Sequence, residues 1–90
     1  MLNIVSSTKF KKDLKRTAKR GYNIDLLEEV VTMLANEEEL PAKYHDHQLT
    51  GNYEGFRECH IQSDWLLIYR IDGEDLMLFL SHTGSYSDLF

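Results

Sequence analysis

The sequence predicts an α+β fold, in which an antiparallel hairpin of two helices packs on a mostly antiparallel four-stranded sheet and a short C-terminal tail follows. Three observations lead to this prediction. A short apolar run occupies residues 2–5, apolar side chains recur at helical spacing over residues 8–34, and three strand-like runs follow within residues 53–82. The 90 residues are enough for one hydrophobic core, so we expect a single domain, residues 1–90.

The chain is predicted to begin with a strand and a helix. Residues 2–5 are apolar and partly β-branched, as is typical of a short strand. The helix begins at a Ser-Thr pair that is suited to capping and ends before Gly21, a residue type common at helix ends. Phe10, Leu14 and Ala18 recur every four positions, and the helix is expected to bury Phe10 and Leu14.

A second helix and an irregular segment come next. Asn23 is suited to cap this helix, and glutamates occupy the face opposite its apolar stripe. That stripe consists of Leu27, Val30, Val31 and Leu34. Pro41 ends helical continuity, and the polar segment up to Gly51 has no clean periodicity. We therefore expect a loop there that holds at most one turn of helix.

Three strand-like runs, residues 53–61, 65–71 and 76–82, are joined by connections of hairpin length. The second connection contains an Asp-Gly pair, which is typical of a tight turn. These features predict an antiparallel meander. Residues 65–69 are apolar without strict alternation, as expected for a central strand that is covered on both faces. Residues 83–90 are expected to form a turn and then a capped helical stub or an extended tail.

Charge is distributed unevenly along the chain, whose formal net charge is −5. Residues 1–20 hold seven lysines and arginines against one aspartate, a balance of +6, so the remaining residues carry −11. A basic helix face on an acidic protein favours local contact with phosphate, although a merely solvated face has the same composition. The basic residues proposed for such contact are Lys11, Lys12, Lys15, Arg16 and Lys19.

Two further features bear on the cellular compartment. Cys59 is the single cysteine, which excludes an internal disulfide and a cysteine-built zinc site and favours a reducing compartment. The N-terminus lacks an apolar signal core, and the apolar runs are too short to span a bilayer. We therefore expect a cytoplasmic protein that does not insert into membranes.

Residues suited to proton transfer gather between positions 44 and 69. This stretch contains three of the four histidines, together with Arg57 and Asp64. Each also has a plain structural interpretation: His60 as a half-buried ring bonded to a carbonyl, Asp64 as a turn residue, and Arg57 as the partner of a neighbouring glutamate. His47 lies in a predicted loop, where a surface histidine without a role is the plain interpretation.

Metal, cysteine and nucleotide chemistries have less support. His45 and His47 lie two positions apart, a spacing that matches no established zinc pattern. The further ligands on offer are His60, His82 and Asp64. Cys59 is expected to point to the sheet face opposite His60, which makes it a buried apolar residue rather than a nucleophile. No glycine-rich nucleotide loop is present, and we expect neither a metal nor a cofactor.

The combination of imidazoles, a carboxylate and an arginine suits metal-free cleavage of RNA by its own 2′-hydroxyl. In that reaction one group removes the 2′-hydroxyl proton, another protonates the leaving 5′-oxygen, and a cation stabilises the phosphorane. The aromatic side chains of Tyr86 and Phe90, near the C-terminus, are suited to stack on unpaired bases.

A family resemblance rests on two segments. Residues 46–69 read DHQLTGNYEGFRECHIQSDWLLIY, and the chain ends in TGSYSDLF. Both resemble the signature of the YafQ branch of RelE-type toxins, and the resemblance extends over essentially the whole chain. It implies a bacterial type II toxin, an endoribonuclease that cuts messenger RNA in the ribosomal A site and is neutralised by a cognate antitoxin. It carries over His47, His60 and Asp64 as catalytic residues and Phe90 as the tail aromatic that helps to place the substrate. The basic helix is then expected to contact 16S ribosomal RNA or the antitoxin.

Two positions depart from the YafQ pattern. Tyr86 stands where YafQ-like proteins commonly have a histidine, and His82 stands where they have an arginine. Other RelE-type toxins use a tyrosine near the tail, so Tyr86 stays among the catalytic candidates. His82 carries charge only when protonated, and with Arg57 it is a candidate for contacting the substrate.

These departures leave an alternative open. A catalytically weak or inactive module of the RelE fold, which only binds an antitoxin or another protein, has the same sequence features. A gyrase poison of the ParE branch fits less well, because those proteins lack this set of histidines.

Overall fold

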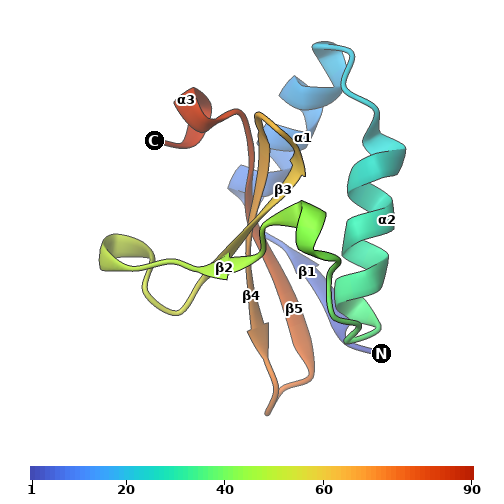
Figure 1. Cartoon of the computed structure of the whole chain (residues 1–90), viewed down its shortest axis with the longest axis vertical. Coiled ribbons are helices and arrows are strands. Elements are labelled where there is room, and N and C mark those ends of the chain that lie inside the picture. The colour runs from blue at the N-terminus through green and yellow to red at the C-terminus, as the bar shows by residue number, and fades with distance from the viewer.

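The computed structural model describes all of residues 1–90 and has two layers, with both long helices on one face of a five-stranded sheet (Figure 1). The strands are β1 (Asn3–Ser6), β2 (His47–Gln48), β3 (Arg57–Gln62), β4 (Trp65–Asp72) and β5 (Met77–Gly84). The helices are α1 (Thr8–Lys19), α2 (Ile24–Ala35) and the one-turn α3 (Tyr86–Leu89), with two short 3-10 helices, η1 (Ala42–Tyr44) and η2 (Gly51–Tyr53). None of these helices combines the length and the apolar character that a bilayer crossing requires.

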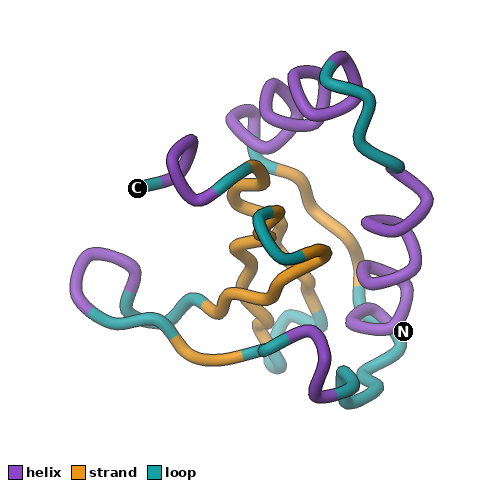
Figure 2. Tube along the Cα trace, turned by 45° about the horizontal axis from the view of Figure 1, so that its top comes forward, coloured by secondary structure: helices purple, strands orange, loops and turns teal.

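The sheet has the strand order β1-β5-β4-β3-β2, with β1 and β5 parallel and every other pair antiparallel. Figure 2 shows the helices wrapped around one side of these strands. This architecture confirms the predicted α+β class, the helical hairpin and the meander. The sheet has one strand more than predicted, because two residues of the expected loop, His47 and Gln48, pair with β3. A strand of two residues is too short to show the alternation by which strands are recognised in a sequence.

Helix α1 buries Phe10 as predicted, and its buried stripe continues through two polar residues. Its buried residues are Phe10, Asp13 and Thr17. Leu14 is only partly buried, and Ala18 is exposed. A four-residue repeat drifts by about 40° per step around a helix of 3.6 residues per turn, whereas alternating steps of three and four stay on one face. The Asp13 carboxylate accepts a hydrogen bond of 3.3 Å from a backbone N–H near the end of β5, which ties α1 to the sheet.

The core lies between α2 and the sheet. Helix α2 is capped as predicted by the Asn23 side chain, which accepts a hydrogen bond from the backbone N–H of Asp25. The helix contributes Leu27, Val30, Leu34 and Ala35 to the core. From the sheet come alternate residues, namely Cys59, Ile61, Trp65, Leu67, Tyr69, Leu78 and Leu80. The fully buried ring of Trp65 meets the Tyr22 ring edge-on, with centroids 5.1 Å apart.

The opposite face of the sheet is covered as well. Leu66 and Ile68 alternate with the core residues of β4, and their exposed fractions are only 1% and 0%. The prediction of a central strand buried on both faces is therefore confirmed. This face carries an aromatic cluster, in which the guanidinium of Arg70 lies over the rings of Phe56 and Phe79. Rings from the η2 loop and from the tail belong to the same cluster, so loops rather than long helices cover this side.

Candidate functional site

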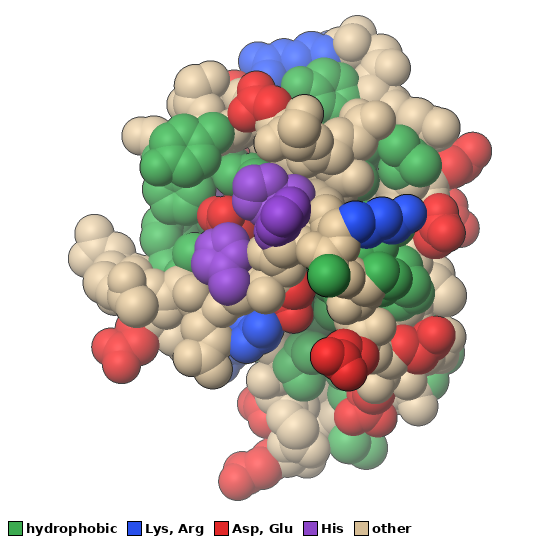
Figure 3. All heavy atoms as spheres, in the orientation of Figure 1, with side chains coloured by type: hydrophobic (Ala, Val, Ile, Leu, Met, Phe, Trp, Pro, Cys, Tyr) green, Lys and Arg blue, Asp and Glu red, His purple; other side chains and the backbone are tan.

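Three side chains, from His47, Glu58 and His60, form a cluster on the sheet face opposite the helices. The pairing of β2 with β3 places His47 beside Glu58, and alternation along β3 places His60 on the same face as Glu58. One oxygen of Glu58, Oε1, lies 3.5 Å from His47 Nε2 and 3.6 Å from His60 Nε2. Figure 3 shows histidine side chains close together near the middle of the face in view. A single carboxylate therefore faces two imidazoles.

The three groups differ in exposure. The Glu58 side chain is 8% exposed, compared with 48% for His47 and 28% for His60. His47 Nδ1 lies 2.7 Å from the backbone carbonyl oxygen of His45, which only accepts hydrogen bonds, so Nδ1 carries a proton. When Nε2 is protonated as well, the His47 ring forms an ion pair with Glu58. The cluster has an accessible imidazole beside a buried carboxylate, an arrangement that is compatible with general acid-base chemistry.

The sequence pattern indicates Glu58 only as a partner for Arg57 and not as a site residue. The signal was present in the alternation of β3, because Glu58 and His60 are two positions apart and two-residue spacing puts side chains on one face of a strand. The missing information was the pairing of β2, which adds His47 to the same spot.

A hollow of about 860 Å³ opens beside these rings and is bounded by α2, η1 and β3. His45, His47 and His60 all line it, and the ring centroids of His45 and His60 are 5.5 Å apart. His45 ends η1 in the left-handed conformation, with φ of 49°, which turns the chain from η1 into β2. No group of three or more His, Cys, Asp and Glu side chains has the arrangement of a metal site.

The C-terminal tail forms a second part of the candidate site. Asp64, in the turn between β3 and β4, accepts a hydrogen bond of 3.2 Å from the backbone N–H of Tyr86 at the start of α3. The structure therefore brings Asp64 to the tail, and it makes no hydrogen bond with a histidine. The side chains of Tyr86 and Phe90 are 61% and 55% exposed, with ring centroids 5.1 Å apart. Of the two forms expected for the tail, a capped helical stub or an extended segment, the structure shows the stub, in which Ser85 and Asp88 form a capping box.

His82 connects the tail with the histidine cluster. The sheet register aligns Glu58, Ile68 and His82 in one row across β3, β4 and β5. Two strand spacings of about 4.8 Å therefore separate the backbone of His82 from that of Glu58. The His82 ring lies 6.1 Å from the Tyr53 ring, and Tyr53 in turn meets Phe90 at 5.8 Å. On its other side His82 Nδ1 is 3.6 Å from a carboxylate oxygen of α1.

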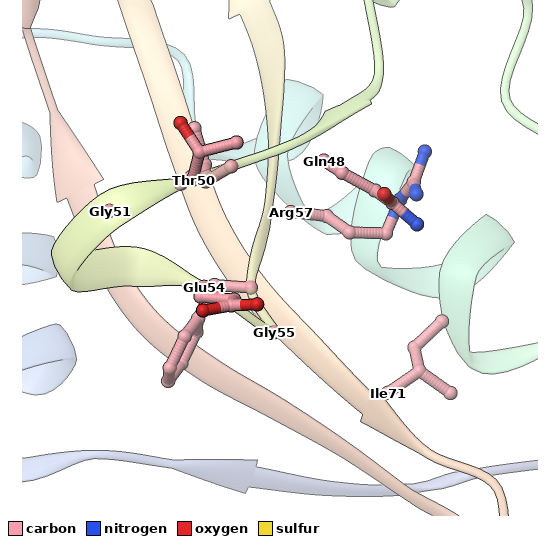
Figure 4. A pocket seen from close by; sticks show the side chains of 9 residues that line it. Gln48, Thr50, Gly51, Glu54, Gly55, Arg57 and Ile71 are labelled. Carbon is pink, nitrogen blue, oxygen red and sulfur yellow. The ribbon is translucent and has the colours of Figure 1, made fainter.

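The structure does not bring Arg57 to this site. Arg57 alternates with Glu58, so its side chain projects to the opposite face of β3. Its guanidinium contacts both oxygens of Asp46, at 3.0 and 3.4 Å, and the Tyr69 hydroxyl donates to the same carboxylate. Asp46 raises the pKa of Arg57, and burial together with Asp46 raises the pKa of Tyr69. Figure 4 shows Arg57 beside Gln48 at a separate hollow of about 660 Å³.

The basic residues of α1 that were proposed for phosphate contact include exposed lysines and one arginine that forms ion pairs within the molecule. The exposed residues are Lys11, Lys12, Lys15 and Lys19. Arg16 is different, because its Nη2 lies 3.3 Å from Asp13 Oδ1 and 3.8 Å from Asp88 Oδ2, and its side chain is 33% exposed. Of the five residues proposed from the sequence, Arg16 is therefore engaged mainly within the molecule.

Cys59 takes the predicted place on the core side of β3. Its side chain is fully buried, and burial raises the pKa of its thiol to about 12. The thiol therefore stays neutral at physiological pH and is sealed from solvent, which is unsuited to a nucleophile.

Known proteins are similar to this chain in both sequence and fold. Residues 2–90 match the family model described as the bacterial toxin of a type II toxin-antitoxin system, YafQ. The mRNA interferase toxin YafQ of Escherichia coli strain K12 is 37% identical over 89 residues, which make up 98% of this chain and 95% of that protein. The crystal structure of a metal-bound toxin from Helicobacter pylori is 49% identical, with a TM-score of 0.94 over all of both chains. The toxin of the E. coli DinJ-YafQ complex is 36% identical, with a TM-score of 0.91 over 100% of this chain and 99% of that one.

Proposed function

Because the chain belongs to the YafQ family of bacterial type II toxins, we propose that it is an endoribonuclease, an mRNA interferase that cleaves messenger RNA and thereby inhibits translation. The observation that carries this proposal is the buried Glu58 carboxylate, which faces the imidazoles of His47 and His60 on the sheet face opposite the helices. The geometry supplies two imidazoles that can carry protons and a carboxylate that can act as counter-ion to a protonated ring. Proton transfer of this kind is what 2′-hydroxyl attack on RNA requires.

The proposed reaction is an internal transesterification. The 2′-oxygen forms a bond to phosphorus while the bond from phosphorus to the 5′-oxygen breaks, which leaves a 2′,3′-cyclic phosphate and a free 5′-hydroxyl. His60 accepts the 2′-hydroxyl proton, and a protonated His47 or Tyr86 supplies the proton to the leaving 5′-oxygen. Protonated His82, in the same row of the sheet, adds positive charge near the phosphate.

Asp64 and the tail aromatics complete this assignment. Asp64 contributes through the tail, because it holds the backbone of Tyr86. The exposed rings of Tyr86 and Phe90 provide a surface on which bases of a single strand stack. Arg57 is left out of the assignment, since its side chain lies on the other face of β3 and is held by Asp46.

The proposed partners follow from the relatives. The E. coli YafQ toxin forms a complex with DinJ, so we infer a cognate antitoxin for this chain. We also infer that it acts in the cytoplasm on messenger RNA in the A site of the ribosome. The exposed lysines of α1 are then the surface that contacts either the antitoxin or the phosphates of 16S ribosomal RNA.

The direct test is the rate of messenger RNA cleavage by the His60→Ala variant. We expect its single-turnover rate to fall by about 100-fold or more, the usual scale for loss of acid-base assistance. Glu74→Ala is the control, because Glu74 lies in the turn at the far end of β4 and β5. A cleavage rate of His60→Ala equal to that of Glu74→Ala removes His60 from the mechanism.

A second candidate function is binding alone. It is favoured by one observation, namely that His82 lies close to the buried carboxylate of Asp13, which engages it within the molecule. In that case the fold serves an antitoxin or another protein and does not cut RNA. Absence of cleavage by folded wild-type protein on translating ribosomes, together with retained antitoxin binding, is the outcome that selects this alternative.

A further inference from the structure

The C-terminal helix α3 carries two residues of the proposed site on a support that is too small to be stable by itself. It has four residues, Tyr86–Leu89, and the side chains of Tyr86 and of the following residue, Phe90, are exposed. A single turn of helix in water is unstable, because nucleation fixes several residues for very few hydrogen bonds. The position of α3 must therefore come from its contacts with other elements.

The strongest of these contacts comes from the end of α1. Arg20 Nη1 donates a hydrogen bond of 2.7 Å to Asp88 Oδ2. The same oxygen accepts the backbone N–H of Ser85 at 2.9 Å, so one carboxylate both caps α3 and joins it to α1. Arg16 stands 3.8 Å from that oxygen and adds further positive charge. Arg20 lowers the pKa of Asp88 well below its usual range, in line with this pairing.

The backbone at Gly84 lies close to the side chains of Arg16 and Asp88. A Cβ at Gly84 would lie 2.9 Å from Arg16 Nη2 and 3.0 Å from Asp88 Oδ2, so that these side chains would have to shift. Glycine therefore leaves room beside the backbone for the Arg16 guanidinium and the Asp88 carboxylate, which are 3.8 Å apart. Asp64 holds the other end of α3 through the backbone of Tyr86. Helix α3 is thus held at two points, by Asp64 at the backbone of Tyr86 and by Arg20, at the end of α1, through the Asp88 carboxylate.

We propose that Arg20 is a positioning residue, which holds α3 through Asp88 so that Tyr86 and Phe90 stay over the sheet face that carries the histidine cluster. This role rests on the proposed ribonuclease function. In it Arg20 acts through α3 and does not need to contact the RNA. It also separates the basic residues of α1 into two groups, with Arg20 and Arg16 turned toward the tail and the lysines exposed to a partner.

The test compares Arg20→Ala, the conservative Arg20→Lys and the charge-matched Lys19→Ala. The order of α3 is measured by the ¹⁵N heteronuclear NOE of the backbone amides of residues 86–90 in the free protein. Cleavage is measured as the single-turnover rate at saturating ribosomes, and ribosome affinity is measured separately. Lys19 is a neighbour of Arg20 that makes no ion pair, so its removal changes the net charge by the same amount without touching α3.

We expect Arg20→Ala to lower the NOE of residues 86–90 and to reduce the saturated cleavage rate about fivefold, as suits one partly exposed, charge-assisted contact. Ribosome affinity should stay within about twofold of the wild type. Arg20→Lys should restore most of both values, and Lys19→Ala should leave the NOE unchanged. High salt should loosen the wild-type tail more than the tail of Arg20→Ala, because the contact is ionic.

Two outcomes overturn the proposal. A tail in Arg20→Ala that is as ordered as in the wild type shows that Arg20 does not hold α3. A loosened tail with an unchanged saturated cleavage rate shows that the contact does not position the reacting site. A wild-type protein that does not cleave at all refutes the ribonuclease function, and the NOE comparison then still decides whether Arg20 holds the tail.

Discussion

At the scale of single residues, Glu58 is the group that holds the proposed site together. Its buried carboxylate is the shared partner of His47 and His60. The Glu58→Gln variant keeps the shape of the side chain and removes the charge that faces both rings. We expect its saturated cleavage rate to fall by about tenfold to 100-fold, because an oriented proton carrier loses its counter-ion, while ribosome affinity stays near the wild-type value.

The matched control for this substitution is Glu54→Gln, since Glu54 is an exposed glutamate four positions away and faces no histidine. Rates measured at saturation and affinities measured by co-sedimentation separate chemistry from binding. Equal cleavage rates for the two glutamine variants would show that the Glu58 charge has no part in the reaction.

The orientation of a side chain could be predicted from the sequence where it depends on a local pattern, and could not where it depends on residues distant in the chain. The burial of Cys59 and its separation from His60 followed from alternation along one strand, which is a local property. The place of Arg57 did not follow, because its orientation depends on Asp46 and Tyr69, which are 11 and 12 positions away in the chain. Glu58 was missed for the same reason, since its partner His47 comes from a different strand.

At the scale of elements, the junction of β5 and α3 is tightly packed at Gly84, the one glycine at which an added Cβ would meet other atoms within 4 Å. Gly84 has a φ of +155°, and an added Cβ would lie 2.9 Å from Arg16 Nη2 and 3.1 Å from Asp88 Cβ. We expect Gly84→Ala to lower the free energy of unfolding by about 1–3 kcal/mol, the usual cost of overpacking. Urea denaturation followed by tryptophan fluorescence measures this change.

Gly73→Ala is the control for the junction, because a Cβ at Gly73 meets no atom within 4 Å and its φ is not in the left-handed region. Its free energy of unfolding should stay close to that of the wild type. If both alanine variants unfold at the same urea concentration as the wild type, the junction between β5 and α3 is not tightly packed.

Elements with clear periodicity were predictable, and elements fixed by distant contacts were not. The caps at Ser7 and Asn23, the helical hairpin and the meander all follow from local patterns. Strand β2 exists only because η1 turns the chain beside β3, so two residues pair without any sequence pattern of their own. The burial of Asp13 in α1 does not follow from the pattern, because this charged residue is held there by β5 and by Arg16.

At the scale of the whole molecule, charge is arranged so that one helix is basic on an otherwise acidic protein. The exposed lysines of α1 are the cations available for phosphate contact. We expect the double variant Lys11→Glu and Lys15→Glu to bind ribosomes more weakly. The slope of log affinity against log salt should become shallower by about 1 to 2, as two phosphate contacts are lost.

Circular dichroism serves as the folding control for this double variant, since both side chains are exposed and should not affect the fold. Ribosome affinity equal to that of the wild type, with the same salt dependence, would mean that these lysines of α1 are merely solvated. In that case the antitoxin becomes the remaining candidate for contact with the basic helix.

The measurement that tests the central claim most directly is primer extension on a translated messenger RNA, with and without ribosomes, for the wild-type protein and for His60→Ala. The account predicts cuts in register with the reading frame, which require ribosomes and are lost or reduced by about 100-fold in His60→Ala. The absence of cuts with folded wild-type protein that is free of antitoxin, or equal cutting by His60→Ala, would contradict the claim that the histidine cluster cleaves RNA.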